Sequence, residues 1–259
     1  MSGPLPSPAS PAPGPAAGAR RVRALEEARV LVVGAGGLGC PASLALARAG
    51  LCHLTLVDPD RVDVTNLHRQ LWHRGADVGR WKVDSAAEGL ARAFPALQVE
   101  RQVARVDASN APALFAAHDV VLDATDGTAT KFLLSDLAKA TRVPLVYAGV
   151  LRMQGQAMRI EPEGPCLRCL FEEPPDPEAV PTCAQAGVLG AMAGWVGALQ
   201  AQLALESLAG AEVGPAAALH VLDGAQLRSR TLRVERVAGC PGCAGTASGV
   251  PWEELRCQR

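Results

Sequence analysis

The stretch that decides the fold is ARVLVVGAGGLG, residues 28–39, in which a short apolar run ends in a glycine-rich loop. The apolar run predicts a buried strand, and the spacing of apolar residues in GLGCPASLALARAG, residues 37–50, predicts a helix directly after the loop. HLTLVD, residues 53–58, is predicted to be a second buried strand. Two strands and a connecting helix within about 30 residues have the size of a parallel β-α-β unit.

The loop carries the pattern Gly34-x-Gly36-x-x-Gly39. In this position glycines allow a tight turn and a close approach of the backbone to a ligand, while the helix N-terminus offers unpaired N–H groups to a phosphate. Asp58 lies 19 residues beyond Gly39, at the end of the second strand, where it can accept hydrogen bonds from ribose hydroxyls. The pattern favours a nucleotide site over a plain tight turn, but it does not distinguish ATP from NAD.

Further elements follow from hydrophobic periodicity and from turn residues. They are a loop at 59–75, a helix at 77–94, a strand at 97–106, a short helix before a strand at 119–126, a helix at 128–142 and a strand at 143–150. An antiparallel strand at 154–160, a Pro-rich loop at 172–182, an apolar helix at 187–209 and strands at 217–223 and 227–234 come next. The expected fold is α/β and Rossmann-like, with a mainly parallel sheet, helices on both faces and a short antiparallel portion at the end.

The composition excludes several classes of protein. With 49% hydrophobic and 20% charged residues among 259, the chain can bury one large α/β core. A net charge of −1 and 3% aromatic residues provide no basic stripe and no stacking surface for nucleic acid. The apolar run at 187–209 reaches Gln200 and Glu206 too soon to span a bilayer of about 30 Å. Residues 1–19 form a Pro/Ala-rich tract that we expect to be disordered. The absence of a secretory signal favours the cytoplasm.

Positive side chains after the second strand favour ATP over NAD. Asn66, Arg69 and Lys82 lie in the strings DPDRVDVTNLHRQ and GRWK. An NAD site needs no cations there, whereas attack on the α-phosphorus of a triphosphate gathers negative charge that Arg, Lys and Mg²⁺ can offset. Asp126 ends a strand at the edge where open α/β sheets bind ligands, so it is a candidate Mg²⁺ ligand. Taken singly, Arg69 and Lys82 would be interpreted as surface charges, and Asp123 as a capping or structural residue; the combination favours the site.

Four of the eight cysteines form two Cys-x-x-Cys pairs, Cys166/Cys169 and Cys240/Cys243. Two such pairs fit a closed, tetrahedral and therefore structural zinc site. The 70 residues between the pairs weaken an argument from spacing alone. Reduced thiols in loops are the main alternative, and a redox disulfide is a more distant one in a reducing compartment.

The other cysteines carry weaker signals. Cys183 directly precedes the helix predicted at 187–209, whose dipole would stabilise a thiolate and make it more nucleophilic. A covalent role for Cys183 and a purely structural one are equally compatible with this position. Cys40 and Cys52 are interpreted as small core residues, and Cys257 as a thiol in the C-terminal tail.

Taken together, GAGGLG, LVDPDRVDVTNLHRQ, GRWK, DATD and PTCAQAGVLG resemble the ThiF/MoeB/HesA family over about residues 29–244. This family contains the adenylyltransferases of molybdopterin and thiamine-thiazole biosynthesis and is related to ubiquitin-activating enzymes. The resemblance implies an enzyme that uses ATP to adenylate the C-terminal Gly-Gly carboxylate of a ubiquitin-like sulfur-carrier protein. It also implies a homodimer and a domain at 20–245, divided into a nucleotide-binding half (about 25–150) and a carrier-binding and zinc portion (about 151–245). Residues 246–259 would be a tail.

The resemblance also implies roles for single residues. Gly37 would lie in the phosphate loop, and Asp58 on the ribose. The implied nucleotide-binding set is Gly34, Gly36, Gly37, Gly39, Asp58, Asp60, Asn66, Arg69, Gln70, Lys82 and Asp126; the catalytic set is Arg69, Lys82, Asp126 and Cys183. ATP, Mg²⁺ and Zn²⁺ would be bound. No general base is implied, because the attacking carboxylate is already ionised.

Three departures from the family pattern affect these expectations. The arginine-bearing N-terminal helix of relatives, which reaches the neighbouring subunit's site, has only Arg20, Arg21 and Arg23 as counterparts here. The usual Asp-Asn after the fourth strand is Asp126-Gly127, and the arginine and asparagine of the next helix are Lys131 and Ser135, which loses the bidentate guanidinium. No rhodanese-like domain follows, which predicts an external sulfur donor.

Two alternative functions are compatible with parts of the sequence. The glycine loop and Asp58 alone would also fit an NAD-dependent oxidoreductase with a Rossmann fold. The altered N-terminus would fit a catalytically degenerate homologue that docks a carrier without adenylating it. Molybdopterin, thiamine, cysteine and siderophore-type pathways all use such activators, so the carrier is not named by the sequence.

Overall fold

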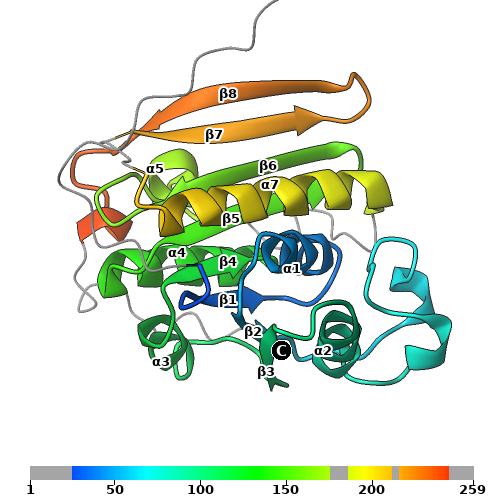
Figure 1. Ribbon diagram of the computed structural model, residues 1–259. Coiled ribbons are helices and arrows are strands. Elements are labelled where there is room, and N and C mark those ends of the chain that lie inside the picture. The colour runs from blue at the N-terminus through cyan, green and yellow to red at the C-terminus, as the bar shows by residue number, and fades with distance from the viewer. Residues whose placement is uncertain (1–24, 176–185, 212–215, 245–259) are drawn as a thin grey trace, which may run out of the picture.

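The parallel half of the sheet is built around the predicted β-α-β unit. The computed structural model describes residues 25–175, 186–211 and 216–244. Its single sheet has the order β3-β2-β1-β4-β5-β6-β7-β8 (Figure 1). The parallel strands are β1 (Arg29–Val33), β2 (His53–Val57), β3 (Gln98–Gln102), β4 (Val120–Asp123) and β5 (Leu145–Leu151). The order 3-2-1-4-5 reverses between β1 and β4, which creates the crevice where doubly wound sheets bind ligands.

The antiparallel half is larger than the short ending that the sequence predicts. Strands β6 (Gln154–Ile160), β7 (Ala216–Asp223) and β8 (Arg228–Glu235) continue the sheet beyond β5 through three antiparallel pairings. The β5–β6 hairpin turns at Arg152, a non-glycine residue with a φ of +55°. The β5–β6 and β7–β8 pairs are hairpins and need no crossover helix. The chain passes through α5 and α7 between β6 and β7, and β7 then pairs with β6, so these strands extend one sheet.

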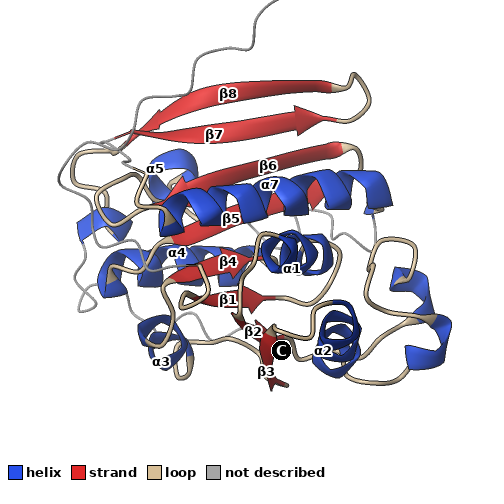
Figure 2. Ribbon diagram, viewed as in Figure 1, coloured by secondary structure: helices blue, strands red, loops and turns tan. Residues whose placement is uncertain are grey.

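Helices cover both faces of the sheet, as the sequence predicts (Figure 2). One face is covered by α1 (Gly39–Arg48), α2 (Lys82–Ala93) and α7 (Gly190–Leu208), and the other by α3 (Ala111–Ala116), α4 (Thr128–Thr141) and α5 (Leu167–Phe171). The single turns η1 (Val64–Asn66), η2 (Gly75–Asp77) and η3 (Gly242–Ala244) lie in connections. Within the described residues, no helix is both long and apolar enough to cross a membrane.

Several predicted boundaries were wrong by a few residues. The strand expected at 119–126 ends at Asp123, so Asp126 lies in the segment after it. The helix expected at 77–94 begins at Lys82, because Gly79 has a φ of +88° and the backbone at 79–82 bonds to Asp60 and Val62 instead. The strand expected at 97–106 ends at Gln102, where its only neighbour, β2, also ends. The helix expected from 187 begins at Gly190. The expected tails at 1–19 and 246–259 lie outside the described residues.

Candidate functional site

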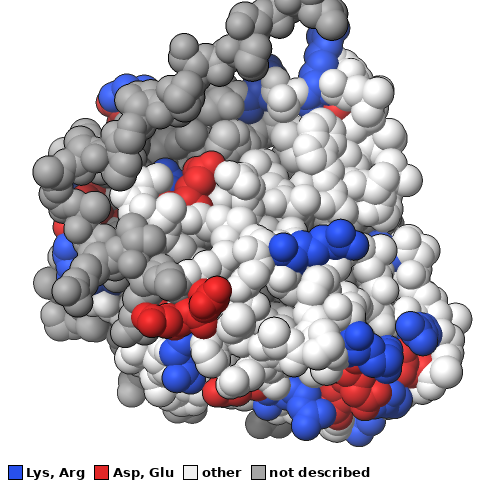
Figure 3. Space-filling view, viewed as in Figure 1, with Lys and Arg blue, Asp and Glu red and all other residues white. Residues whose placement is uncertain are grey.

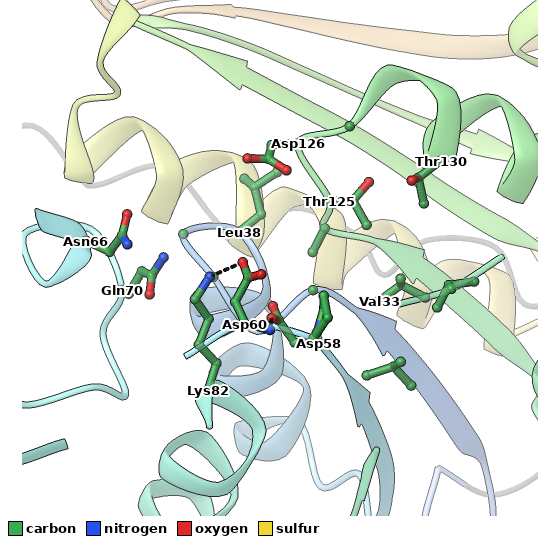
Figure 4. Close-up of a pocket in the computed structure, with 18 of the residues that line it drawn as sticks. Val33, Leu38, Asp58, Asp60, Asn66, Gln70, Lys82, Thr125, Asp126 and Thr130 are labelled. Carbon is green, nitrogen blue, oxygen red and sulfur yellow. Dashed lines mark hydrogen bonds and ion pairs between the residues drawn. The ribbon is translucent and has the colours of Figure 1, made fainter. Parts of the chain in front are cut away.

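A pocket of about 390 Å³ opens at the carboxyl ends of β1, β2 and β4 (Figure 4). This volume lies within the range of about 300–1,000 Å³ that is typical of small-molecule sites. The pocket is lined by the glycine loop on one side, by the connection between β2 and α2 on a second side, and by the segment between β4 and α4 on a third. The crevice is therefore at the place that the strand order predicts.

The glycine loop needs glycine at two positions for steric reasons. Gly34 has a φ of +103°, and a Cβ there would lie 2.6 Å from the carbonyl oxygen of Ala124. A Cβ on Gly39 would lie 1.9 Å from the carbonyl oxygen of Gly34, so the first turn of α1 packs directly under the loop. Gly34, Gly36 and Gly37 line the pocket, whereas Gly39 is outside its lining. Three of the four predicted loop glycines thus face the ligand space, and the fourth shapes the turn.

Asp58 links the end of β2 to the glycine loop. Its Oδ2 accepts the N–H of Ala35 at 2.7 Å, and its Oδ1 accepts the N–H of Asp60 at 2.8 Å. Burial raises the pKa of Asp58, an effect that the Lys82 ammonium and these two N–H groups oppose. Each carboxylate oxygen keeps a second lone pair, so the side chain can still accept hydrogen bonds from hydroxyls in the pocket.

The predicted cations lie on the side of the pocket formed by the β2–α2 connection. Lys82, the first residue of α2, places its Nζ 2.7 Å from Oδ2 of Asp60 (Figure 4). Arg69 donates from Nη2 to Oδ1 of Asn66 at 2.6 Å. Gln70 is buried beside them, and its Oε1 has no hydrogen-bond partner in the structure. An unpaired buried amide oxygen is costly, which suggests that a donor on a ligand completes this wall.

Asp126 enters the pocket from the opposite side. It follows β4, is exposed to solvent and lines the cavity together with Thr125 and Thr130 (Figure 4). The structure thus brings the predicted nucleotide-binding residues into one pocket, with Gly39 beneath it. Cys183 lies outside the described residues, as do Arg20, Arg21 and Arg23.

The two substituted positions on α4 have different environments. Lys131 lines the pocket, and its Nζ donates to the carbonyl oxygen of Ala148 at 2.6 Å and to Oδ2 of Asp123 at 3.2 Å. Asp123 also accepts the N–H and hydroxyl of Thr125, so it has the structural role rather than capping α4. Ser135 is fully buried away from the pocket, where its hydroxyl accepts the N–H of Leu167.

Sequence reasoning missed the pocket wall after β3. Ala104, Arg105 and Val106 line the cavity and lie in a segment that had been predicted to be strand. The available signal was topological: the segment that follows each parallel strand at its carboxyl end faces the same crevice. Recognising it required the true end of β3 at Gln102, which pairing with β2 determines.

The four paired cysteines converge into one cluster between α5 and η3. Their Sγ atoms all lie within 4.8 Å of one another. Four of the Sγ–Sγ separations are 4.0 Å (Cys166–Cys169), 3.6 Å (Cys166–Cys240), 3.4 Å (Cys169–Cys243) and 3.5 Å (Cys166–Cys243). Four sulfurs at about 2.3 Å from a common centre would be about 3.8 Å apart in a tetrahedron, so the cluster fits a zinc ion.

Basic side chains surround this cluster. Arg168 forms a two-pronged ion pair with Asp136, and Arg236 donates to the carbonyl oxygen of Cys243 at 2.7 Å. Lys139 is buried, and its Nζ donates to three carbonyl oxygens, those of Glu161, Pro162 and Gly164, at 3.0, 2.5 and 2.6 Å. Four thiolates around a divalent ion would carry two net negative charges, which nearby cations offset.

The two other described cysteines, Cys40 and Cys52, lie outside this cluster. Burial raises the pKa of Cys40 to about 12, so its thiol stays protonated at neutral pH. Cys52 is half-buried and contacts the carbonyl oxygen of Gly50. Cys40 is thus the small core residue that the sequence predicts, whereas Cys52 is only half-buried and lies outside the core. Cys257 lies outside the described residues.

Comparisons with known proteins identify relatives of this chain. The chain is 42% identical over 226 residues to "Adenylyltransferase and sulfurtransferase MOCS3" of Culex quinquefasciatus, which covers 86% of this chain and 52% of that protein. It is 42% identical over 219 residues to "SAMP-activating enzyme E1" of Haloferax volcanii, covering 85% of this chain and 81% of the relative. The chain therefore spans about half the length of the MOCS3 relative and most of the length of the archaeal one.

The solved structures that resemble the fold include E. coli MccB with MccA, with a TM-score of 0.72 at 16% identity. That match covers 85% of this chain and 67% of MccB and supports the fold alone. The model of the ThiF family matches residues 13–242. With this match over most of the sequence, and with the MOCS3 and E1 relatives above, the chain belongs to the ThiF family.

Proposed function

We propose that this protein uses ATP to adenylate the C-terminal carboxylate of a ubiquitin-like sulfur-carrier protein that ends in Gly-Gly. The names of the MOCS3 and Uba4 relatives, which are adenylyltransferases and sulfurtransferases, and of the archaeal activating enzyme support this activity. The observation that carries the proposal is the pair of cations at the glycine loop. Arg69 and Lys82 line the same pocket as Gly36 and Gly37, where an NAD site would need no positive side chains.

The reaction requires charge compensation more than proton transfer. An oxygen of the carrier carboxylate forms a bond to the α-phosphorus of ATP, and the bond from that phosphorus to the bridging oxygen breaks, so that pyrophosphate leaves with the electron pair. No proton moves, since the attacking carboxylate is ionised at neutral pH. Arg69 and Lys82 would stabilise the charge that builds on the phosphate oxygens. Asn66 and Gln70 would hold those oxygens by hydrogen bonds, and Asp58 would bind the ribose.

Asp126 is proposed to bind Mg²⁺ with the departing phosphates. Its carboxylate is exposed at the edge of the pocket, across from Lys82 and Asp60, so it would hold the ion as one protein ligand beside several waters. Lys82 would then exchange its present partner, Asp60, for phosphate oxygen when ATP binds. We propose that Zn²⁺ occupies the four-cysteine cluster as a structural ion, and that the chain works in the reducing cytoplasm.

The carrier and a second protomer are the proposed partners. Residues about 151–245 would bind the carrier, and an external donor would supply sulfur. The face formed by α1 and α7 is mostly uncharged (Figure 3). Along α7, a stripe of exposed side chains (Ala191, Trp195, Ala198 and Gln202) contains no charge. We propose that this stripe packs against the second protomer. Light scattering would then give a dimer for the native chain and a monomer for Trp195→Glu.

Pyrophosphate exchange tests the proposed activity. ³²P-pyrophosphate should enter ATP only when a Gly-Gly-ended carrier is present, and a carrier that lacks its last glycine should not support exchange. Tight NAD(H) binding without carrier-dependent exchange would instead identify the oxidoreductase alternative. ATP binding together with carrier binding, but without adenylate formation, would identify a degenerate docking protein.

A further inference from the structure

A buried histidine behind the glycine loop takes no part in the functions above. His73 lies in the connection between β2 and α2, is 6% exposed and does not line the pocket. Its Nε2 is 3.0 Å from the carbonyl oxygen of Ala35, and its Nδ1 is 2.9 Å from Oγ of Ser85 on α2. A carbonyl oxygen can only accept, so Nε2 carries the proton and Nδ1 accepts the Ser85 hydroxyl. Burial lowers the pKa of His73, which keeps this tautomer neutral.

This contact fixes the orientation of one peptide group in the loop. A trans peptide is planar, so its carbonyl oxygen and N–H point in opposite directions. No peptide bond of the described chain is cis, and the carbonyl of Ala35 points to His73. The N–H of Gly36 in the same peptide therefore points away from His73, on the side where Gly36 lines the pocket. Within the described residues, this N–H has no acceptor.

The same peptide precedes a residue with wide conformational freedom. Gly36 has no side chain, so its backbone can adopt more combinations of φ and ψ than that of other residues. A rotated peptide would turn a carbonyl oxygen, in place of an N–H, toward the bound phosphates. On the other side of Ala35, its N–H is already bonded to Asp58. The Ala35 carbonyl is a second point of control, where it accepts from His73 Nε2 at 3.0 Å and, in a longer contact, from the Cys40 thiol at 3.4 Å. The Gly36 carbonyl accepts the N–H of Cys40 at 3.0 Å.

We propose that His73 is a positioning residue that holds the Ala35–Gly36 peptide so that the Gly36 N–H faces the phosphates of the bound nucleotide. Through Ser85, the same side chain couples the loop to α2, the helix that begins with Lys82. The glycine loop and the phosphate-side cation are thereby held in one geometry. The nature of the nucleotide rests on the proposed function, but the orientation of the peptide does not.

The test compares two substitutions of similar length, with ATP and adenosine as ligands in calorimetric titrations. Gln can place an N–H₂ donor near the position of Nε2, whereas Met cannot donate. His73→Met should weaken ATP binding about 10-fold or more and leave adenosine binding unchanged, since one hydrogen bond to the loop is lost. His73→Gln should stay within a few-fold of the native chain for both ligands.

His118 provides a matched control. It is also buried, with its Nε2 2.7 Å from Oγ1 of Thr55, but it lies just before the amino end of β4, whereas the pocket opens at the carboxyl ends of the strands. His118→Met should leave the ratio of ATP to adenosine affinity unchanged. The inference would be overturned if His73→Met lost the same affinity for ATP as for adenosine, or if it kept the native affinity for ATP. It would also be overturned if His73→Gln bound ATP as weakly as His73→Met. If the native chain binds NAD and not ATP, the proposed function fails. The inference about His73 is then tested in the same variants by the ratio of NAD affinity to adenosine affinity.

Discussion

The glycine-loop pocket and the four-cysteine cluster differ in how completely their polar groups are satisfied. In the pocket, Oε1 of Gln70 has no partner, Asp126 is exposed, and Lys82 is held by one half-exposed carboxylate. At the cluster, the ammonium of Lys139 has three carbonyl partners, and Arg168 is fully engaged by Asp136. Polar groups without partners suit a site whose ligand binds and is released. Polar groups that are fully hydrogen-bonded suit a structural ion that stays bound. Substitutions should therefore affect binding in the first region and folding in the second.

Loss of a cysteine ligand should have the largest effect. Cys240→Ser removes one of the four sulfurs of the cluster, and zinc binding of this kind contributes roughly 10 kcal/mol to the folded state in small zinc domains. We expect the variant to retain little zinc and to lose several kcal/mol of unfolding free energy. Zinc per chain and thermal denaturation measure this. Cys52→Ser, outside the cluster, serves as the control, and a Cys240 variant with native zinc content and native stability would contradict the structural role.

Removal of a phosphate-side cation should have the next largest effect, and it should be confined to activity. Lys82→Ala is expected to lower the rate of pyrophosphate exchange about 10²–10³-fold, the range found for loss of one preorganised charge-stabilising group. Stability should change little, because the partner carboxylate of Asp60 is more than half exposed to solvent, which weakens the ion pair that is lost. Arg101→Ala, which removes an exposed ion pair with Asp84 outside the pocket, is the control. If Lys82→Ala lowered the melting temperature together with the rate of pyrophosphate exchange, the two regions would no longer differ in the way proposed.

Lys139→Met tests whether the cations around the four-cysteine cluster support metal binding there and not nucleotide binding. The substitution keeps the length of the side chain but removes a buried ammonium that organises the loop Glu161–Gly164 ahead of Cys166. Groups around metal ligands typically change affinity 10–100-fold, so zinc should be lost to a chelator about that much faster. The release is followed with a chromogenic chelator, and nucleotide affinity is measured in parallel. Unchanged zinc release, or a selective loss of ATP affinity, would argue against the assigned role.

The smallest expected effect is a dependence of stability on pH. Burial lowers the pKa of both His73 and His118 in the folded chain, while an unfolded histidine has a pKa of about 6.5. The unfolded chain thus binds more protons as pH falls through about 6.5 toward the lowered folded values, and stability decreases over that window. The slope is at most about 1.4 kcal/mol per pH unit for each histidine. Urea denaturation at pH 7.5 and 5.5 should show a smaller loss in His118→Gln; an identical loss in both chains would refute the assignment.

Local pattern was sufficient to predict the nucleotide half. The apolar run before Gly34, the glycine spacing and Asp58 at the end of the next strand are all encoded within about thirty residues, and the structure contains them in that arrangement. The predicted ends of elements were wrong where a neighbouring strand in the sheet determines where the element stops. The strand β3 stops at Gln102 because β2 offers no further partner, and no property of residues 103–106 indicates this. Arg105 was missed for the same reason.

His73 shows a different limit of sequence reasoning. Nothing in its immediate sequence distinguishes it from a surface histidine, and its two partners, Ala35 and Ser85, lie 38 residues before and 12 residues after it. Only the packing of the β2–α2 connection against the glycine loop brings the three together. The proposed role of His73 depends on the orientation of one carbonyl group. A local sequence pattern carries no information about that orientation.

The sequence by itself determined the β-α-β unit, the phosphate loop and the chemical types of the site residues, because these depend on steric and hydrogen-bonding preferences of neighbours along the chain. It also specified two cysteine pairs, each capable of providing half of a tetrahedral site. Only the tertiary structure decided that the pairs meet across 70 residues, that Asp126 faces Lys82 over the pocket, and that three carbonyls enclose Lys139. Those arrangements depend on the order of strands in the sheet and on helix packing, and both arise from contacts between residues far apart in the sequence.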